Sequence, residues 1–342
     1  MNKHKSTLLG VLVYTLKNNY LIFTYLFIPL LMKEYQNISY FMPLIFIPIT
    51  LVLILLLPKK APDINYNAIM NRSFIVKISY YLVQLISLIL NIVLVSYTIQ
   101  RMFFYKESIV FFIITALLVA IYISTNKVEV IFNSSSLLFI IAIILIVFPV
   151  FLTSDVKDFT LVMPLYDFKG FSFLFLIYFI FDAISMLLSG ANIKGKLTKW
   201  KLAIPIFIML IFMTLELLNI IVVSGTTYLL DNEFLGFFML FIQDTINYIG
   251  NLGHFFLYVI PVVGCFKAGY ALRKLKDGFN IKDSLFVNII ISVILFFLIY
   301  MIIYFIEIPV IAFYMILIST ILLGIIYLFI ILNRSLNYEI RF

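Results

Sequence analysis

Residues 284–333 read SLFVNIIISVILFFLIYMIIYFIEIPVIAFYMILISTILLGIIYLFIILN, and Glu307 is their only charged residue. The apolar runs on either side of Glu307 have about the 20 residues that an α-helix needs to cross a hydrocarbon layer of about 30 Å. This stretch therefore predicts two membrane-spanning helices, 284–306 and 308–333. We expect Glu307 to lie in the turn between them, in contact with water.

The rest of the chain has the same character. Of its 342 residues, 64% are hydrophobic and 12% are charged, which excludes a water-soluble protein. The apolar residues form long runs and not short alternating segments, so the spans are helices. We predict an all-α membrane protein with ten transmembrane helices and a single membrane domain over 1–342. The expected spans are 8–32, 39–58, 76–100, 108–124, 136–153, 170–190, 202–224, 248–272, 284–306 and 308–333.

The distribution of Lys and Arg predicts the orientation of the chain. Cytoplasmic loops retain basic residues, whereas short translocated loops avoid them. With ten spans, a cytoplasmic N-terminus and Lys77 at its span's end counted with the preceding loop, 17 of the 24 basic residues fall in inner segments, 5 in outer segments and 2 within spans. This split predicts that both the N- and C-termini are cytoplasmic. The basic loops also explain the net charge of +8, so we expect no nucleic-acid partner.

The sequence lacks the motifs of common enzymes and metal sites. Cys265 is its only cysteine, and it has two histidines, which fall on opposite sides of the predicted topology. Paired-carboxylate motifs, a glycine-rich phosphate loop and a His-Glu-x-x-His motif are all missing. We therefore expect no catalytic residue, metal or cofactor, and a protein that is not an enzyme. A polytopic cell-envelope enzyme, such as an acyltransferase or polysaccharide polymerase, stays open as the alternative.

Four ionisable residues stand out within the predicted spans, where inserting a charge costs about 2.5–3.5 kcal/mol. Asp182 lies near the middle of its span, too deep for its short side chain to reach water, and needs a cavity, a cation or a partner helix. The alternative for Asp182 is a protonated carboxyl that is hydrogen-bonded to a neighbouring helix. Lys267 could instead reach the inner interface, because Arg273 follows less than two turns later. The remaining two are Lys17 and Glu216.

The first span is interrupted by three adjacent polar residues, Lys17-Asn18-Asn19. They predict either a broken helix that lines a binding site or a cap on a short helix at the cytoplasmic face. Ten spans can arise as two halves of five, whose opening spans carry Asn18-Asn19 and Asp182, and this correspondence favours an inverted-repeat transporter. We expect ligand contacts from Asn18, Asn19, Asp182 and Ser185. A charge relay or structural pair is expected among Lys17, Glu216 and Lys267.

Several short segments occur in an order that is similar to one known family. They are Lys127-Val128-Glu129-Val130-Ile131-Phe132 ahead of Phe148-Pro149, Asp158-Phe159 with Met163-Pro164-Leu165, Phe181-Asp182, and Gly264-Cys265-Phe266-Lys267-Ala268-Gly269-Tyr270 before Asp277-Gly278-Phe279. Together they resemble the endospore germination permeases, the B subunits of nutrient-germinant receptors in the amino acid–polyamine–organocation superfamily. The likeness covers most of 60–285. It departs at Asn18-Asn19, where the family has Gly-Ser, and at Asp182, where it has a glutamate.

This resemblance implies a fold, a ligand and partners. The fold would be a ten-helix core of the amino acid permease type, a 5+5 inverted repeat. The ligand would be a small nutrient, such as an amino acid, held between spans 1, 3, 6 and 8. The protein would be a multi-pass component of the cell membrane, surrounded by lipids, and specifically of the spore inner membrane. Its role would be the nutrient-binding subunit of a spore germinant receptor, with A-type and C-type subunits as partners, or a related permease.

Overall fold

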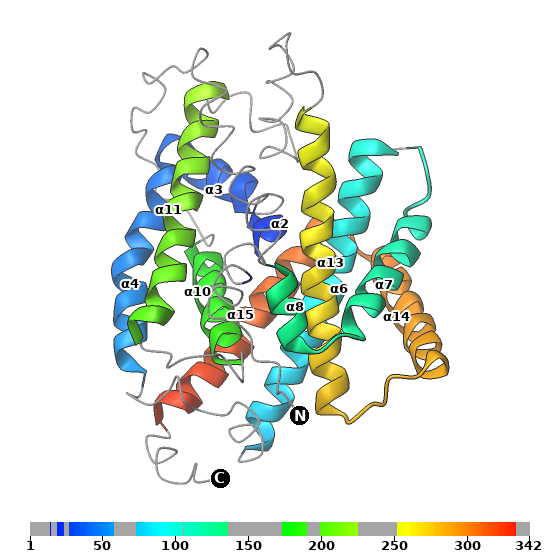
Figure 1. The fold of residues 1–342 in the computed structure, drawn as a ribbon. Coiled ribbons are helices and arrows are strands. Elements are labelled where there is room, and N and C mark those ends of the chain that lie inside the picture. The colour runs from blue at the N-terminus through cyan, green and yellow to red at the C-terminus, as the bar shows by residue number, and fades with distance from the viewer. Residues whose placement is uncertain are drawn as a thin grey trace.

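The computed structural model describes residues 14, 19–23, 27–57, 73–104, 106–135, 173–189, 199–224 and 252–332. Every regular element in these residues is a helix, as predicted (Figure 1). The helices are α2 (Tyr20–Ile22), α3 (Ile28–Tyr35), the 3-10 helix η2 (Gln36–Phe41), α4 (Met42–Leu56), α6 (Phe74–Phe103), α7 (Ile109–Ser124), α8 (Val128–Ser135), α10 (Phe173–Ser189), α11 (Lys199–Ser224), α13 (Leu252–Gly278), α14 (Leu285–Phe305) and α15 (Ile308–Leu332).

The described residues contain several helices that are long and apolar enough to cross a membrane. Five pass this test singly, and α7 with α8 passes only as a pair that is bent by 112°. The chain is therefore a multi-pass membrane protein with five or six candidate spans in its described part. The expected span 136–153 lies outside the described residues. The five single spans are Ser39–Leu56, Phe74–Arg101, Lys199–Val222, Leu285–Phe305 and Ile308–Leu332.

Local sequence signals set several helix ends. Serine side chains accept hydrogen bonds from the first turns of α6, α7 and α14, and so satisfy N–H groups that have no partner within the helix. The pairs are Ser73 with the N–H of Val76, Ser108 with that of Val110, and Ser284 with that of Val287. Glu307 lies in an exposed turn between α14 and α15, where it was predicted. Its carbonyl accepts the N–H of Ile311 at 2.9 Å.

Two helical segments differ from the sequence expectation. The residues between the expected spans 8–32 and 39–58 are helical, because α3 is followed directly by η2 and α4. The expected span 248–272 continues as α13 to Gly278, and an ion pair of 2.8 Å between Arg273 and Asp277 supports its last turns. The positive φ of 53° at Asn280 follows the end of this helix.

Helices α6 and α13 form the centre of the bundle. They pack against each other, α7 packs on both, and α15 packs on α6 and α10. Helices α4 and α11 pair at one edge in Figure 1, and α14 lies at the opposite edge. At Gly264 of α13, an added Cβ would lie only 2.5 Å from a methyl of Val95 and 2.6 Å from one of Leu21. Gly264 thus allows α13 to approach both α6 and α2 closely.

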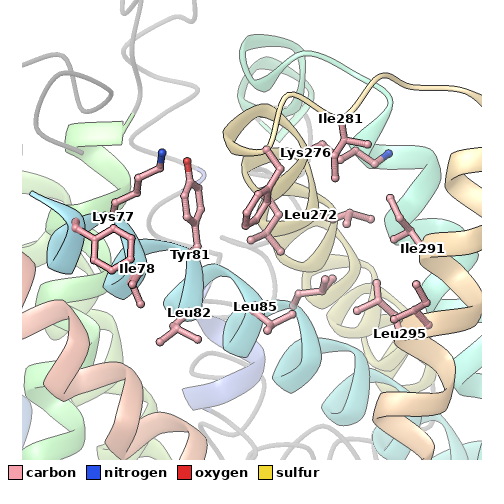
Figure 2. Close-up of a pocket in the computed structure, with 15 residues that line it drawn as sticks. Lys77, Ile78, Tyr81, Leu82, Leu85, Leu272, Lys276, Ile281, Ile291 and Leu295 are labelled. Atoms are coloured by element: carbon pink, nitrogen blue, oxygen red, sulfur yellow. The ribbon is translucent and has the colours of Figure 1, made fainter. Parts of the chain in front are cut away.

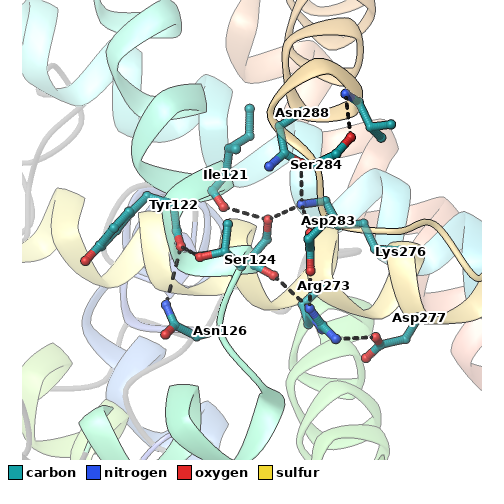
Figure 3. Close-up of polar contacts among 12 residues, drawn as sticks. Ile121, Tyr122, Ser124, Asn126, Arg273, Lys276, Asp277, Asp283, Ser284 and Asn288 are labelled. Atoms are coloured by element: carbon teal, nitrogen blue, oxygen red, sulfur yellow. Dashed lines mark hydrogen bonds and ion pairs between the residues drawn. The ribbon is translucent and has the colours of Figure 1, made fainter.

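A polar network joins the ends of α7, α13 and α14 (Figure 3). The Lys276 ammonium donates hydrogen bonds of 2.9 Å to each of Ser124 Oγ, Asp283 Oδ1 and Asn288 Oδ1. Arg273 forms a second ion pair of 2.7 Å with Asp283. These contacts satisfy the charge of Lys276, whose side chain is only 1% exposed, and they fix the register of three helices.

Candidate functional site

An ion pair between Asp182 and Lys267 lies in the interior of the bundle. The Lys267 Nζ atom is 3.0 Å from Asp182 Oδ2, and the two side chains are 0% and 6% exposed. Asp182 belongs to α10 and Lys267 to α13, so the pair joins two helices that are far apart in the chain. Inside a membrane protein, a buried charge of this kind is stable only with a partner.

Asn19 completes the site, because its side-chain amide contacts both members of the ion pair. Its Nδ2 donates to Asp182 Oδ2 at 2.9 Å, and its Oδ1 accepts a hydrogen bond from Lys267 Nζ. Asn19 is 1% exposed and lies directly before α2, where its backbone carbonyl accepts the N–H of Phe23. We call these three residues the Asn19–Asp182–Lys267 cluster. An acid, a base and an amide from three separate helical regions thus meet at one buried point.

Tyr178 contacts the cluster through both its hydroxyl group and its aromatic ring. It lies one turn before Asp182 on α10, and its hydroxyl accepts a hydrogen bond of 3.3 Å from Lys267 Nζ. The same ammonium is 5.5 Å from the centre of the Tyr178 ring, within the range of a cation–π interaction. The sequence analysis did not single out this residue. Its spacing of one helical turn from Asp182 is the signal that could have identified it.

A second group of aromatic residues packs beside Lys267. Tyr14 is fully buried, with ring centres 4.9 Å from Phe132 and 5.4 Å from Tyr270. Tyr270 is one turn after Lys267 on α13, and the Tyr14 hydroxyl donates to the carbonyl of Phe266 at 3.4 Å. These rings cover the turn of α13 that carries Lys267, which helps to exclude water from it.

Helix α6 contributes a row of buried polar residues that the sequence analysis also missed. Their separations of three, four and seven residues place them along one face of the helix. Two of their oxygens, Asn91 Oδ1 and Thr98 Oγ1, are buried and have no hydrogen-bond partner among the described residues. The backbone of Asn91 lies at the crossing of α6 with Gly264, one turn from Lys267. The row consists of Gln84, Ser87, Asn91 and Thr98.

The remaining predicted site residues have different positions. Ser185 is buried on α10, one turn after Asp182, whereas Glu216 is half-buried on α11, which carries no member of the cluster. Lys17 and Asn18 lie outside the described residues. Of the two positions expected for Lys267, the structure has the buried one: its side chain is 0% exposed and does not reach the inner interface.

Comparison with other proteins does not assign this chain to a family. It matches no protein-family model, and no curated protein matches it significantly. Inferences about function therefore depend on the geometry of the cluster and on the short segments that resemble the germination permeases.

Proposed function

We propose that this protein is a membrane-embedded binding subunit or permease for a small zwitterionic nutrient, with an amino acid as the class of ligand. The observation that supports this proposal most is the Asn19–Asp182–Lys267 cluster. A buried acid and a buried base at hydrogen-bonding distance are complementary to a ligand that carries one charge of each sign.

Charge balance is the physical reason for preferring a zwitterion. When an amino acid enters between the two side chains, its ammonium group binds the Asp182 carboxylate and its carboxylate binds the Lys267 ammonium. Each buried charge then keeps a partner, and the net charge of the site does not change. A simple amine or a simple acid would pair with only one side chain and would leave the other buried and uncompensated.

The Asn19 amide can contact either end of such a ligand, because it carries both an acceptor oxygen and an NH₂ donor. Its present bonds to Asp182 and Lys267 hold the two groups together without a ligand. Ligand entry therefore requires the Asp182 and Lys267 side chains to separate. We infer that this separation is the local step that couples binding to a change in helix packing.

The ten-span topology, with a 5+5 inverted repeat and cytoplasmic termini, is part of the proposal. The expected opening spans of the two halves contribute Asn19 and Asp182, which are hydrogen-bonded to each other. Lys267 belongs to the expected eighth span, and the third expected span, α6, crosses α13 beside it. These contacts are consistent with a ligand between spans 1, 3, 6 and 8.

The resemblance to germination permeases extends the proposal to a biological role. In that role the chain would be the nutrient-binding subunit of a germinant receptor in the spore inner membrane, together with A-type and C-type subunits. Phe181-Asp182 and the segment around Lys267 belong both to this resemblance and to the cluster. Copurification of such subunits with the tagged chain from spores would support the role, and their absence would contradict it.

Ligand chemistry provides the test of the proposed binding activity. The purified protein in lipid nanodiscs should be titrated with amino acids, with the amines that lack their carboxylate and with the acids that lack their amino group. We expect an amino acid to bind at least about 30-fold more tightly than either analogue, the equivalent of about 2 kcal/mol for one lost buried ion pair. Equal binding of the amine or the acid would contradict the proposal, as would failure of every amino acid to bind.

A further inference from the structure

An apolar groove runs between the first turns of α6, the last turns of α13 and the outer helix α14 (Figure 2). Its volume is about 530 Å³, which is within the range of sites that hold a molecule of drug or lipid-fragment size. Most of its wall is aliphatic. The aliphatic wall includes Ile78, Leu82 and Leu85 of α6, Leu272 of α13, and Ile291 and Leu295 of α14.

The groove opens toward the lipid phase. Helix α14 is at the edge of the bundle, and groove residue Ile294 is 61% exposed. On the opposite wall, Ile78 and Leu82 of α6 are also exposed. In a multi-pass membrane protein, such large exposed apolar side chains face acyl chains, so an occupant of the groove enters from the bilayer.

The polar side chains on the groove wall gather at one end. Lys77 and Tyr81 are four residues apart on α6, and Figure 2 shows the Lys77 ammonium and the Tyr81 hydroxyl pointing the same way, away from Leu82 and Leu85. The other lysine of the wall, Lys276, is already bound by Asp283, Ser124 and Asn288. In the described part of the chain, Lys77 forms no ion pair, so its charge is available to an anionic occupant.

This polar end lies on the side that the distribution of Lys and Arg predicts to be cytoplasmic. Anionic phospholipids concentrate in the cytoplasmic leaflet, and basic pockets between transmembrane helices bind their head groups. We propose that the groove binds one anionic phospholipid. An acyl chain lies along the aliphatic wall, and the phosphate pairs with the Lys77 ammonium and accepts a hydrogen bond from the Tyr81 hydroxyl. This site is distinct from the Asn19–Asp182–Lys267 cluster, because it shares no residue with it.

A lipid in this position would join helices that have few other contacts. Helix α14 packs only lightly on α6, whereas both helices line the groove. The bound acyl chain would therefore stabilise the position of α14 beside the α6–α13 centre. It would also lie next to Lys276, which holds the first turn of α14 through its hydrogen bond to Asn288.

Native mass spectrometry of the full chain provides the test. Protein should be equilibrated in detergent with phosphatidylglycerol or with phosphatidylcholine of the same acyl chains, and the retained lipid counted. We expect the wild type to retain one phosphatidylglycerol and about tenfold less phosphatidylcholine. Lys77→Gln should lower phosphatidylglycerol retention about tenfold, the effect of losing a charged hydrogen bond. The control Lys282→Gln removes an exposed lysine near α14 and should retain lipid like the wild type.

A second variant tests whether the acyl chain of the phospholipid occupies the groove. Ile291→Trp places a large ring in the groove and leaves Lys77 in place, so it should also lower retention of phosphatidylglycerol. Equal retention of the two lipids by the wild type would overturn the proposal. The same holds if Lys77→Gln and Lys282→Gln retain equal amounts of phosphatidylglycerol, or if Ile291→Trp retains as much as the wild type.

Discussion

Asp182 and Lys267 are 85 residues apart in the chain, yet their side chains form a buried ion pair of 3.0 Å. Both charges lie within the bundle of a membrane protein, where an unpaired charge is costly. The pair therefore makes the stability of the fold depend on both residues together. This dependence can be measured separately from any ligand.

Removal of one member of the pair should destabilise the protein more than removal of both. Asp182→Ala leaves the Lys267 ammonium buried and should cost about 3–5 kcal/mol, whereas Asp182→Ala with Lys267→Met should cost less. The single cysteine, Cys265, is buried, so the rate of its reaction with a thiol dye on heating reports unfolding. Equal losses in the single and double variants would show that the two charges are not coupled.

Asn19→Ala should also destabilise the fold, because Asp182 loses a donor and Lys267 loses an acceptor. We expect a cost of about 1.5–3 kcal/mol for hydrogen bonds to charged groups. Asn126→Ala is the matched control, since the bonds of Asn126 are two weak contacts of 3.4 Å to backbone carbonyls at the end of α7. Thermal unfolding can be followed by the reaction of Cys265 with a thiol dye, and its midpoint should be lower in Asn19→Ala than in Asn126→Ala. Similar midpoints would be evidence against the bridging role of Asn19.

Gly264 should not tolerate even a methyl group. A Cβ there would lie 2.5 Å from Val95 and 2.6 Å from Leu21, so Gly264→Ala should push α13 away from α2 and cost about 1–3 kcal/mol. At Gly324 the nearest atom would be Phe181 Cε2 at 3.7 Å, an ordinary contact. The free energy of unfolding of Gly324→Ala should therefore lie within about 0.5 kcal/mol of the wild-type value. The close packing described for α13 would be contradicted by equal effects at the two glycines.

Cysteine labelling tests the predicted orientation. Lys282 and Glu307 are exposed residues just before and just after α14, which is a candidate span, so they should lie on opposite sides of the membrane. With an impermeant maleimide and intact cells, Glu307→Cys should be labelled and Lys282→Cys should react only after permeabilisation. The wild type, with Cys265 buried, should remain unlabelled. Labelling of Lys282→Cys but not Glu307→Cys in intact cells would show that the orientation is opposite to the predicted one.

Most of the described helices could be predicted from the sequence, because the length of an apolar run determines whether a helix can span a bilayer. The turn at Glu307 is an example, since one charged residue separates two apolar runs. Helix α13 ran past its predicted end because the Arg273–Asp277 ion pair supports the helix after the apolar run has finished. The hydropathy of the sequence gives no information about such an ion pair.

The candidate site could be predicted only in part. Asp182 and Lys267 stood out because charges within spans are rare, but their pairing with each other depends on how distant helices pack. Tyr178 and Asn91 were missed because neutral polar residues are common in spans. The contact of Tyr178 with Lys267 and that of Asn91 with Gly264 arise from the tertiary fold.

Calorimetric titration of an amino acid into the nanodisc-embedded protein tests the central claim most directly. The comparison is between the wild type and the neutral pair Asp182→Asn with Lys267→Met, which removes both charges and leaves neither one unpaired. Glu307→Gln, which removes a carboxylate at the exposed turn, is the control. We predict affinity at least about 30-fold weaker for the neutral pair and unchanged for the control, because the ligand loses its buried ionic contacts. Wild-type affinity in a folded neutral pair would contradict the account.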